Sequence, residues 1–325
     1  MELSCAFAPG PDTVEHVRIA EQLGYGRAFL YDSPALYADV WVHLCRAAER
    51  TQRIGLGPGV LVPSNRHPMT TAAAIATLVS VAGADRVVVG VGSGFTGRMA
   101  MGQRPLRWSH VAEYVRTVRR LLRGERVRWE GALVEMLHDP GFGPPRPIEV
   151  PFLIGVGGPR GTAVARELGE GVFTSRTPAA GFAWSVVLAL GTVLEEGEDP
   201  GSERALAAAG AAASVGLHYL AEYGQLREDA RLWLAAYDDL PAEARHLAMH
   251  RGHLVSLNER DRPFVTGRLL ARMGVALSAS GWRERLAGLE AAGATEVAYQ
   301  PAGPDIPREL EAFARAARGS ETRAL

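Results

Sequence analysis

Strand-like runs that end in glycine recur along this chain. Residues 86–97, Arg-Val-Val-Val-Gly-Val-Gly-Ser-Gly-Phe-Thr-Gly, place β-branched residues before closely spaced glycines. Residues 54–62 and 151–160 repeat the arrangement, and a helix-like stretch follows each of the three runs. Glycines at the carboxyl ends of strands let backbone N–H groups approach an anion or a flat ring closely. Several such ends in one chain favour a barrel whose mouth holds a cofactor.

Strand-like and helix-like segments alternate along the whole sequence. We expect strands at residues 3–8, 27–31, 54–62, 86–91, 152–156, 171–175, 212–218 and 296–299. We expect helices at residues 12–23, 39–50, 68–82, 109–123, from 159 onward, 182–196 and 307–317. Eight strand–helix units predict an α/β fold, a (β/α)8 TIM barrel, which needs about 250 residues. The 325-residue chain therefore has room for insertions.

Two regions are expected to hold these insertions. Residues 126–147 are rich in proline and glycine and predict a small ribbon and a loop. Residues 220–293 are too long for one helix and are expected to add helices near the C-terminal mouth of the barrel. No linker-like composition divides the chain, so we expect a single domain over residues 1–325.

A doubly wound sheet is the competing fold. Gly92-x-Gly94-x-x-Gly97 formally matches the dinucleotide-binding fingerprint. That fingerprint normally follows the first strand of its domain, with an acidic residue about 20 residues further on at the end of the second strand. Here it follows the fourth expected strand, and Glu113 falls inside an expected helix. The barrel is therefore the favoured fold.

Composition limits the classes of partner. Charged residues make up 22% of the chain and the net charge is -1, which is unlike a nucleic-acid-binding protein. Cys5 and Cys45 are too few for a disulfide framework and are expected to be free thiols. No apolar run approaches the roughly 18 residues that span a membrane, and the first residues lack the basic start of a signal peptide. We expect a cytoplasmic protein with a small-molecule substrate and no nucleic-acid or membrane partner.

At this point the sequence resembles a known family. Residues 57–69, Gly-Pro-Gly-Val-Leu-Val-Pro-Ser-Asn-Arg-His-Pro-Met, and residues 85–94 are similar to the luciferase-like flavin and deazaflavin oxidoreductases. Within them, the chain is most similar to the methylenetetrahydromethanopterin reductase branch, which uses coenzyme F420. Residues 150–160 and 299–305 agree, and the similarity fades across about 176–294. The resemblance implies coenzyme F420 as cofactor, with FMN as the alternative, and a homodimer or larger homo-oligomer.

The resemblance implies residues that contact the ring of the cofactor. In the deazaflavin branch a non-prolyl cis peptide bends the ring, and here it maps to Gly59 and Val60. Alternatively, glycine at this place only relieves packing in the barrel. Asn65 corresponds to a contact with the ribityl chain, and Ser93 and Gly94 correspond to contacts with the polar edge of the ring.

A second set of residues is expected to bind the phosphate of the cofactor. Gly157, Gly158 and Arg160 lie where an expected strand becomes a helix, and exposed N–H groups at a positive helix end suit an anion. The family adds the end of the next strand, here Thr174 and Ser175. Alternatively, the turn is an ordinary connector and Arg160 is solvated.

Asp32 is the first candidate for catalysis. An acidic residue in this place lies beside the ring in deazaflavin enzymes, so Asp32 either positions a hydroxyl or caps the following segment. The sugar-phosphate dehydrogenase branch carries a histidine and a glutamate where this chain has Ser33 and Phe95. Oxidation of a sugar hydroxyl is therefore not expected, and reduction of an activated C=C or C=N bond is favoured.

His246, His250 and His253 lie at i, i+4 and i+7, which is one face of a helix. His250 and His253 are candidates for proton delivery, because a histidine exchanges protons near neutral pH. The alternative is a packed or solvated face. No metal site is predicted, because the H-E-x-x-H pattern is absent. Asp261 and Arg262 are expected to form a surface ion pair.

Three functions are compatible with these features. The first is an F420-dependent reductase that transfers a hydride to an activated double bond. The second is an FMN-dependent luciferase-like monooxygenase, and the third is a non-catalytic barrel that binds a cofactor. The segment at 57–69 favours the first.

Overall fold

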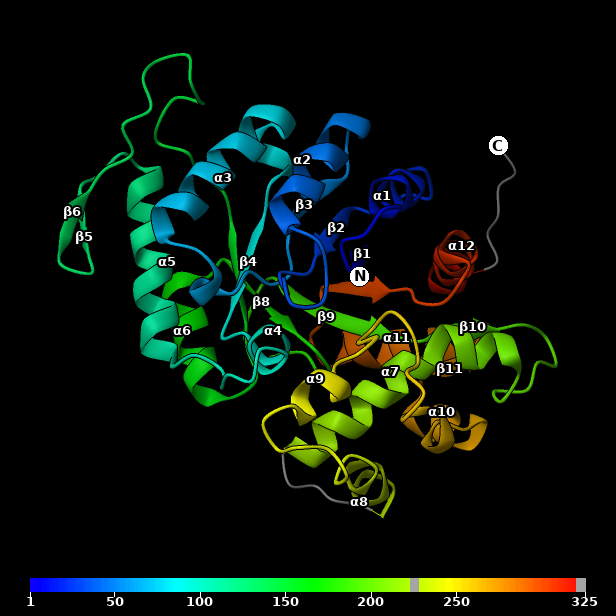
Figure 1. The fold of residues 1–325 in the computed structure, drawn as a ribbon. Helices are drawn as coiled ribbons and strands as arrows, with labels where there is room; N and C mark the ends of the chain where they lie inside the picture. Colours follow the sequence, from blue (N-terminus) through cyan, green and yellow to red (C-terminus); the bar gives the residue numbers. More distant parts are fainter. Residues whose placement is uncertain (223–227, 320–325) are drawn as a thin grey trace. The chain divides into compact units, whose positions relative to one another are not determined.

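The computed structural model describes residues 1–222 and 228–319 (Figure 1). Contacts between residues divide the chain into two compact units. The first, which we call the barrel unit, comprises Met1–Arg98, Arg104–Leu188 and Ala292–Ala298. The second, which we call the helical unit, comprises Met99–Gln103, Ala189–Ala291 and Tyr299–Leu325. The single domain expected over residues 1–325 stays a prediction.

Eight strands form one sheet in the order β3-β2-β1-β12-β9-β8-β7-β4. They are β1 (Glu2–Phe7), β2 (Arg27–Leu30), β3 (Gly55–Pro58), β4 (Val89–Gly92), β7 (Phe152–Gly155), β8 (Gly171–Thr174), β9 (Ser185–Leu190) and β12 (Glu296–Gln300). Parallel bridges from Leu56 to Val87 and from Leu61 to Val91 join the two ends of this order. The sheet is thus nearly closed, which confirms the predicted barrel; the doubly wound alternative is wrong.

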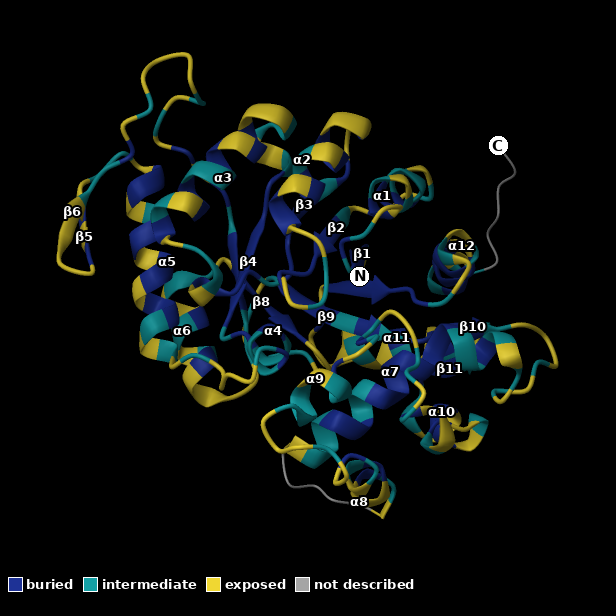
Figure 2. Cartoon of the chain, viewed as in Figure 1, coloured by how far each residue is buried: buried dark blue, intermediate teal, exposed yellow. Residues whose placement is uncertain are grey.

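Five helices of the barrel unit follow one another, each packed against the next (Figure 1). They are α1 (Thr13–Gln22), α2 (Val40–Arg50), α3 (Pro68–Ala82), α5 (Trp108–Leu122) and α6 (Pro159–Leu168). Local chemistry sets where they begin. Asp39 caps α2 by accepting hydrogen bonds from the N–H groups of Trp41 and Val42, at 2.9 and 3.1 Å. Figure 2 shows that the strands of the eight-stranded sheet are mostly buried, whereas the helices keep exposed faces.

Shorter elements complete the described part of the barrel unit and its connections. They are the helix α4 (Phe95–Met99), the 3-10 turns η1 (Pro63–Asn65) and η2 (Ala84–Arg86), and the strands β5 (Val127–Trp129) and β6 (Ala132–Val134). β5 and β6 form an antiparallel ribbon, as predicted for residues 126–147. Its turn residues Glu130 and Gly131 have φ of 49° and 83°, the left-handed conformation that a two-residue hairpin turn requires.

The helical unit has its own core. Its elements are α7 (Glu203–Glu222), α8 (Glu228–Ala235), α9 (Arg245–Met249), α10 (Gly267–Met273), α11 (Ala279–Ala291), α12 (Ile306–Arg318), η3 (Arg262–Phe264) and the parallel strands β10 (Thr192–Leu194) and β11 (Ala276–Ser278). Leu217, Trp233, Tyr237 and Leu270 are fully buried together. The helices predicted for residues 220–293 are confirmed; their place near the barrel mouth stays a prediction. No described helix is both long and apolar enough to cross a membrane.

Two expected elements are wrong. Residues 182–196, predicted as a helix, contain β9 and β10. β9 is buried along most of its length, and a continuous apolar run of this kind has no alternation that separates a strand from a helix. Residues 212–218, predicted as a strand, lie within α7, whose many alanines favour a helix.

Candidate functional site

The side chain of Val60 lies among glycines of β4 and β7. A Cβ atom placed on Gly90, Gly92 or Gly155 would come within 3.1, 2.6 or 3.1 Å of a methyl carbon of Val60. These glycines therefore give the Val60 side chain its room between the two strands. Val60 keeps part of its surface exposed, whereas its two neighbours in the chain are buried. The barrel unit thus presents a partly exposed apolar side chain between the carboxyl ends of its strands.

The peptide bond between Gly59 and Val60 is cis, as predicted. The glycines also relieve packing in the barrel. A Cβ atom on Gly59 would lie 2.7 Å from the Cβ of Phe29, and one on Gly57 would lie 1.6 Å from the carbonyl oxygen of Val88. Contact of Gly59 and Val60 with a cofactor ring stays a prediction.

Asp32 follows β2, and its carboxylate is almost fully buried. Oδ2 accepts a hydrogen bond from the N–H of Val62 at 3.0 Å, and Oδ1 accepts one from Arg66 at 2.7 Å. Arg66 also donates to Asp39 at 2.8 Å. Burial favours the neutral form of Arg66, but the two carboxylates outweigh it and raise the pKa of Arg66, so the guanidinium stays charged. Asp32 therefore holds the segment after β3 in place against the end of β2. Contact of Asp32 with a cofactor or substrate stays a prediction.

Three other predicted residues lie around this segment. The side chain of Asn65 donates to the carbonyl oxygen of Asp32 at 3.4 Å, which is a long hydrogen bond. Gly94 has φ of 79°, and a Cβ atom there would lie 2.5 Å from the side chain of Val62. Ser93 precedes Gly94 and is partly exposed. The structure therefore brings Asp32, Asn65 and Gly94 together around Val62, and their contacts with a cofactor stay predictions.

The turn from β7 to α6 is exposed from Gly157 to Arg160. A Cβ atom on Gly157 or Gly158 would meet no heavy atom of the described residues within 4 Å, beyond its chain neighbours, so the backbone is open to a ligand. Gly158 caps α6, and the first N–H groups of a helix carry a partial positive charge. The exposed guanidinium of Arg160 adds a full positive charge to this turn. The geometry is suited to an anion.

The end of β8 lies beside this turn. Gly155 of β7 pairs with Phe173 of β8, so the two strands end at the same edge of the sheet. Ser175 is exposed there, whereas Thr174 is buried and its hydroxyl donates to the carbonyl oxygen of Val186 at 3.3 Å. Ser175 is therefore the better placed of the two for a ligand. Phosphate binding at these positions stays a prediction.

His250 and His253 lie in the helical unit, where His218 of α7 joins them. The ring centroids of His218 and His250 are 4.7 Å apart, and those of His250 and His253 are 5.4 Å apart. Burial lowers the pKa of all three rings, that of His218 to about 3, so the rings are neutral near pH 7. Proton delivery by His250 and His253 stays a prediction. The sequence pattern missed His218, because it lies on a helix far from the other two in the chain.

The sequence also missed how two charged residues act. The role of Arg66 had one signal, an arginine in the segment that follows the strand after Asp32. The expected surface pair of Asp261 with Arg262 is wrong, because Asp261 is buried. Its carboxylate accepts hydrogen bonds from Trp233 at 2.6 Å and from Asn258 at 2.8 Å, which a spacing pattern does not reveal.

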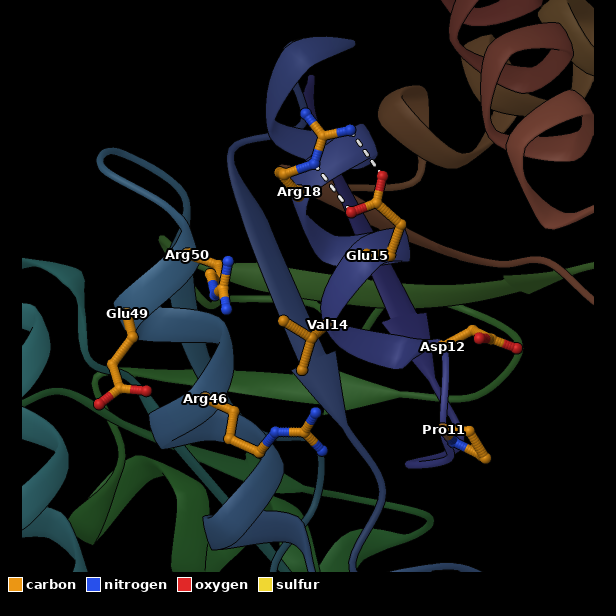
Figure 3. A pocket seen from close by; sticks show the side chains of 8 residues that line it. All are labelled: Pro11, Asp12, Val14, Glu15, Arg18, Arg46, Glu49 and Arg50. Carbon is orange, nitrogen blue, oxygen red and sulfur yellow. Dashed lines mark hydrogen bonds and ion pairs between the residues drawn. The ribbon is translucent and has the colours of Figure 1, made fainter.

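A groove of about 370 Å³ lies between α1 and α2 (Figure 3). Glu15 and Arg18 pair on its wall at 2.6 Å. Three acidic and three basic side chains line the groove, so it favours neither an anionic nor a cationic ligand. None of the predicted site residues lines this groove. The lining residues are Pro11, Asp12, Val14, Glu15, Arg18, Arg46, Glu49 and Arg50.

Comparisons with known proteins agree with the family resemblance. A family model described as luciferase-like monooxygenase matches residues 7–296. A 5,10-methylenetetrahydromethanopterin reductase from Archaeoglobus fulgidus is 31% identical over 180 residues, which cover 53% of this chain and 52% of the reductase. An F420-dependent glucose-6-phosphate dehydrogenase from Microbacterium testaceum is 31% identical over 174 residues, covering 48% of this chain and 50% of the dehydrogenase. The chain thus spans about half the length of these curated relatives.

One solved structure extends the likeness over the whole chain. The coenzyme F420-dependent tetrahydromethanopterin reductase from Methanopyrus kandleri superposes with a TM-score of 0.68 over 98% of both chains. The two sequences are 17% identical, so this likeness concerns the fold alone.

Proposed function

Because the chain belongs to the luciferase-like monooxygenase family, we propose that it is an F420-dependent oxidoreductase. In this proposal it transfers a hydride from reduced deazaflavin to an activated C=C or C=N bond of a small organic substrate. The cofactor is supported by the relatives, among which the dehydrogenase from Microbacterium testaceum is named F420-dependent.

The observation that supports this function most directly is the partly exposed side chain of Val60, which Gly92 and Gly155 accommodate. A flat ring system needs an apolar surface to lie on, and Val60 with Gly59 would provide it. Ser93 and Gly94 would offer backbone groups to the polar edge of the ring. Asn65 would contact the ribityl chain, because among the described residues its side chain makes a single, long hydrogen bond, to Asp32.

The anionic tail of the cofactor would bind at the turn before α6. The backbone at Gly157 and Gly158 has the open space that a phosphate needs, and Arg160 brings a positive charge. Ser175, and Thr174 through its backbone, would complete this subsite, because the hydroxyl of Thr174 already donates to Val186. This donor set fits a phosphate-bearing group.

The residues of this chain bind and orient, and F420 supplies hydride chemistry when it is bound. Asp32 would act by holding the segment from Val62 to Arg66 in place, because both of its carboxylate oxygens are occupied. In this proposal water, in place of the predicted His250 and His253, supplies the proton for the second atom of the reduced bond. Burial lowers the pKa of His250 and of His253, so the protonated form of either side chain is weakly populated near pH 7.

Reduction is favoured over oxidation of a sugar phosphate. Ser33 is buried and has no charge, and Phe95 places a partly exposed aromatic side chain after β4. Neither side chain is an acid or a base. An apolar wall at Phe95 suits an organic substrate with an activated double bond.

Cofactor titration tests the proposal. We expect the purified full chain to bind oxidised F420 with a dissociation constant in the micromolar range or below, and FMN at least tenfold more weakly. Tight binding of FMN without binding of F420, with oxygen consumption on reduced FMN, would replace the proposal by the second candidate, a monooxygenase, which the family description favours. Binding of neither cofactor would leave a non-catalytic barrel.

A further inference from the structure

Three histidine side chains meet in the interior of the helical unit. His218 comes from the C-terminal half of α7, His250 directly follows α9, and His253 lies three residues further. Their exposed fractions are 4%, 2% and 7%. One ring nitrogen of each histidine lies within 4.8 Å of those of the other two. The fold thus collects three nitrogen atoms in one buried place.

His250 is held in the tautomer that leaves Nε2 with its lone pair for a ligand. Its Nδ1 lies 2.8 Å from the carbonyl oxygen of His246. A carbonyl oxygen only accepts, so Nδ1 carries the hydrogen and Nε2 keeps its lone pair. Nε2 is buried and has no hydrogen-bond partner within residues 1–222 and 228–319. Histidines that ligate a metal commonly donate their other ring N–H to a backbone carbonyl in this way.

The surroundings are compatible with a cation. The ring of Trp233 packs against His218 with centroids 5.7 Å apart, and the indole N–H of Trp233 donates to Asp261 at 2.6 Å. The carboxylate of Asp261 is saturated by its donors, so it does not join the histidines, but its negative charge lies in the same core.

We propose that His218, His250 and His253 bind one divalent transition-metal ion, and that Zn²⁺ fits the set best. Three neutral imidazoles are a known zinc ligand set, in which water or an anion takes the fourth position. Zinc–nitrogen bonds of about 2.0–2.1 Å in a tetrahedral site bring the nitrogen atoms to roughly 3.4 Å from one another. The ring nitrogen atoms, which lie within 4.8 Å of one another, would draw closer together around the ion. The ion then ties α7 to the segment that follows α9.

Metal titration tests this site. The full chain, without a polyhistidine tag and stripped with a chelator, is titrated with Co²⁺ as an optical probe, and Zn²⁺ is then used to displace it. We expect one Co²⁺ per chain with visible d–d absorption, and displacement by one Zn²⁺. His250→Gln is expected to lower the affinity at least about 100-fold, because a ligand is lost. His246→Gln is the matched control, because its ring lies near Gly102, outside the set of three histidines, and its backbone carbonyl, which accepts from His250, is retained.

Two results of the titration would overturn the site: a wild-type chain that binds no Co²⁺, or a His250→Gln chain that binds it as tightly as His246→Gln. If His250→Gln does not fold, His253→Gln gives the same comparison. A thermal melt provides an independent readout. Zn²⁺ at a hundred times its dissociation constant is expected to stabilise the wild type by about 2.7 kcal/mol. The same stabilisation in both cluster variants would also contradict the site.

Discussion

Arg66 donates a hydrogen bond to Asp32 across 2.7 Å and so joins the turn after β3 to the end of β2. The side chains are 13% and 1% exposed, so this ion pair is largely removed from water. Arg66 also reaches Asp39, which caps α2. One guanidinium therefore ties together three segments of the barrel unit, among them the one that carries Asn65.

Removal of the Asp32 carboxylate is expected to destabilise the fold. Asp32→Ala leaves Arg66 with only Asp39 and leaves the N–H of Val62 without its acceptor. Loss of one partner of a buried ion pair costs about 3 kcal/mol. Urea unfolding measures the change. Glu15→Ala is the matched control, because Glu15 pairs with Arg18 at a similar distance but in solvent, and its midpoint is expected to stay nearly unchanged. Equal shifts in both variants would contradict the structural role of Asp32.

The loss of stability caused by a side chain at position 92 is expected to depend on Val60. Gly92→Ala would bring a methyl group to 2.6 Å from Val60, and overpacking of this kind costs about 1–3 kcal/mol. Val60→Ala removes the opposing methyl groups, so the double variant is expected to be more stable than the sum of the single changes predicts. Denaturant unfolding of the wild type, the two single variants and the double variant measures the free energies of unfolding that this comparison needs. Strict additivity would show that the two residues do not touch.

The turn at Gly158 is expected to affect cofactor affinity without affecting stability. Gly158→Asp places a negative charge where the phosphate would bind, in open space with ordinary extended backbone. We expect F420 to bind at least about tenfold more weakly, which corresponds to about 1.4 kcal/mol. Gly158→Ala is the control and is expected to bind as the wild type does. Calorimetric titration provides the affinities, and a wild-type affinity in Gly158→Asp would remove this subsite.

A fall in pH is expected to destabilise the helical unit, because it protonates Glu198. Hydrogen bonds from Arg204, one of them 2.8 Å long, lower the pKa of Glu198 to about 2. In the unfolded chain a glutamate titrates near about 4.3, so the unfolded chain binds more protons between these two values. The stabilisation that the ionised carboxylate of Glu198 contributes to the folded state is therefore complete above about pH 4.3 and is lost as the pH falls toward 2. Melting temperatures at pH 6, 4 and 3 are expected to fall more steeply for the wild type than for Glu198→Gln. Parallel curves would refute this assignment.

The sequence predicted the elements whose boundaries depend on local chemistry. Residues 68–82 form α3 with the predicted bounds, because Pro68 suits the first turn and Gly83 follows the last. β9 was missed, because a strand buried in a barrel has the same uniform apolar character as a buried helix. Its correct place is set by pairing with β8, which is a long-range contact.

The candidate site was predictable where backbone geometry determines it. Glycines at positions 59, 94 and 158 indicated close approach or an open turn, and each lies at a strand end or a helix start. The ion pair of Asp32 with Arg66 and the contact of His218 with His250 were not predictable. Both depend on side chains from separate elements that only the folded chain brings together.

A crystal structure of the full chain with F420 tests the central claim most directly. We predict electron density for a flat ring against Val60 and for a phosphate within hydrogen-bond distance of the backbone at Gly157 and Gly158. Density for F420 at any other place, or strand ends of the barrel filled by side chains in crystals grown at saturating F420, would contradict the account.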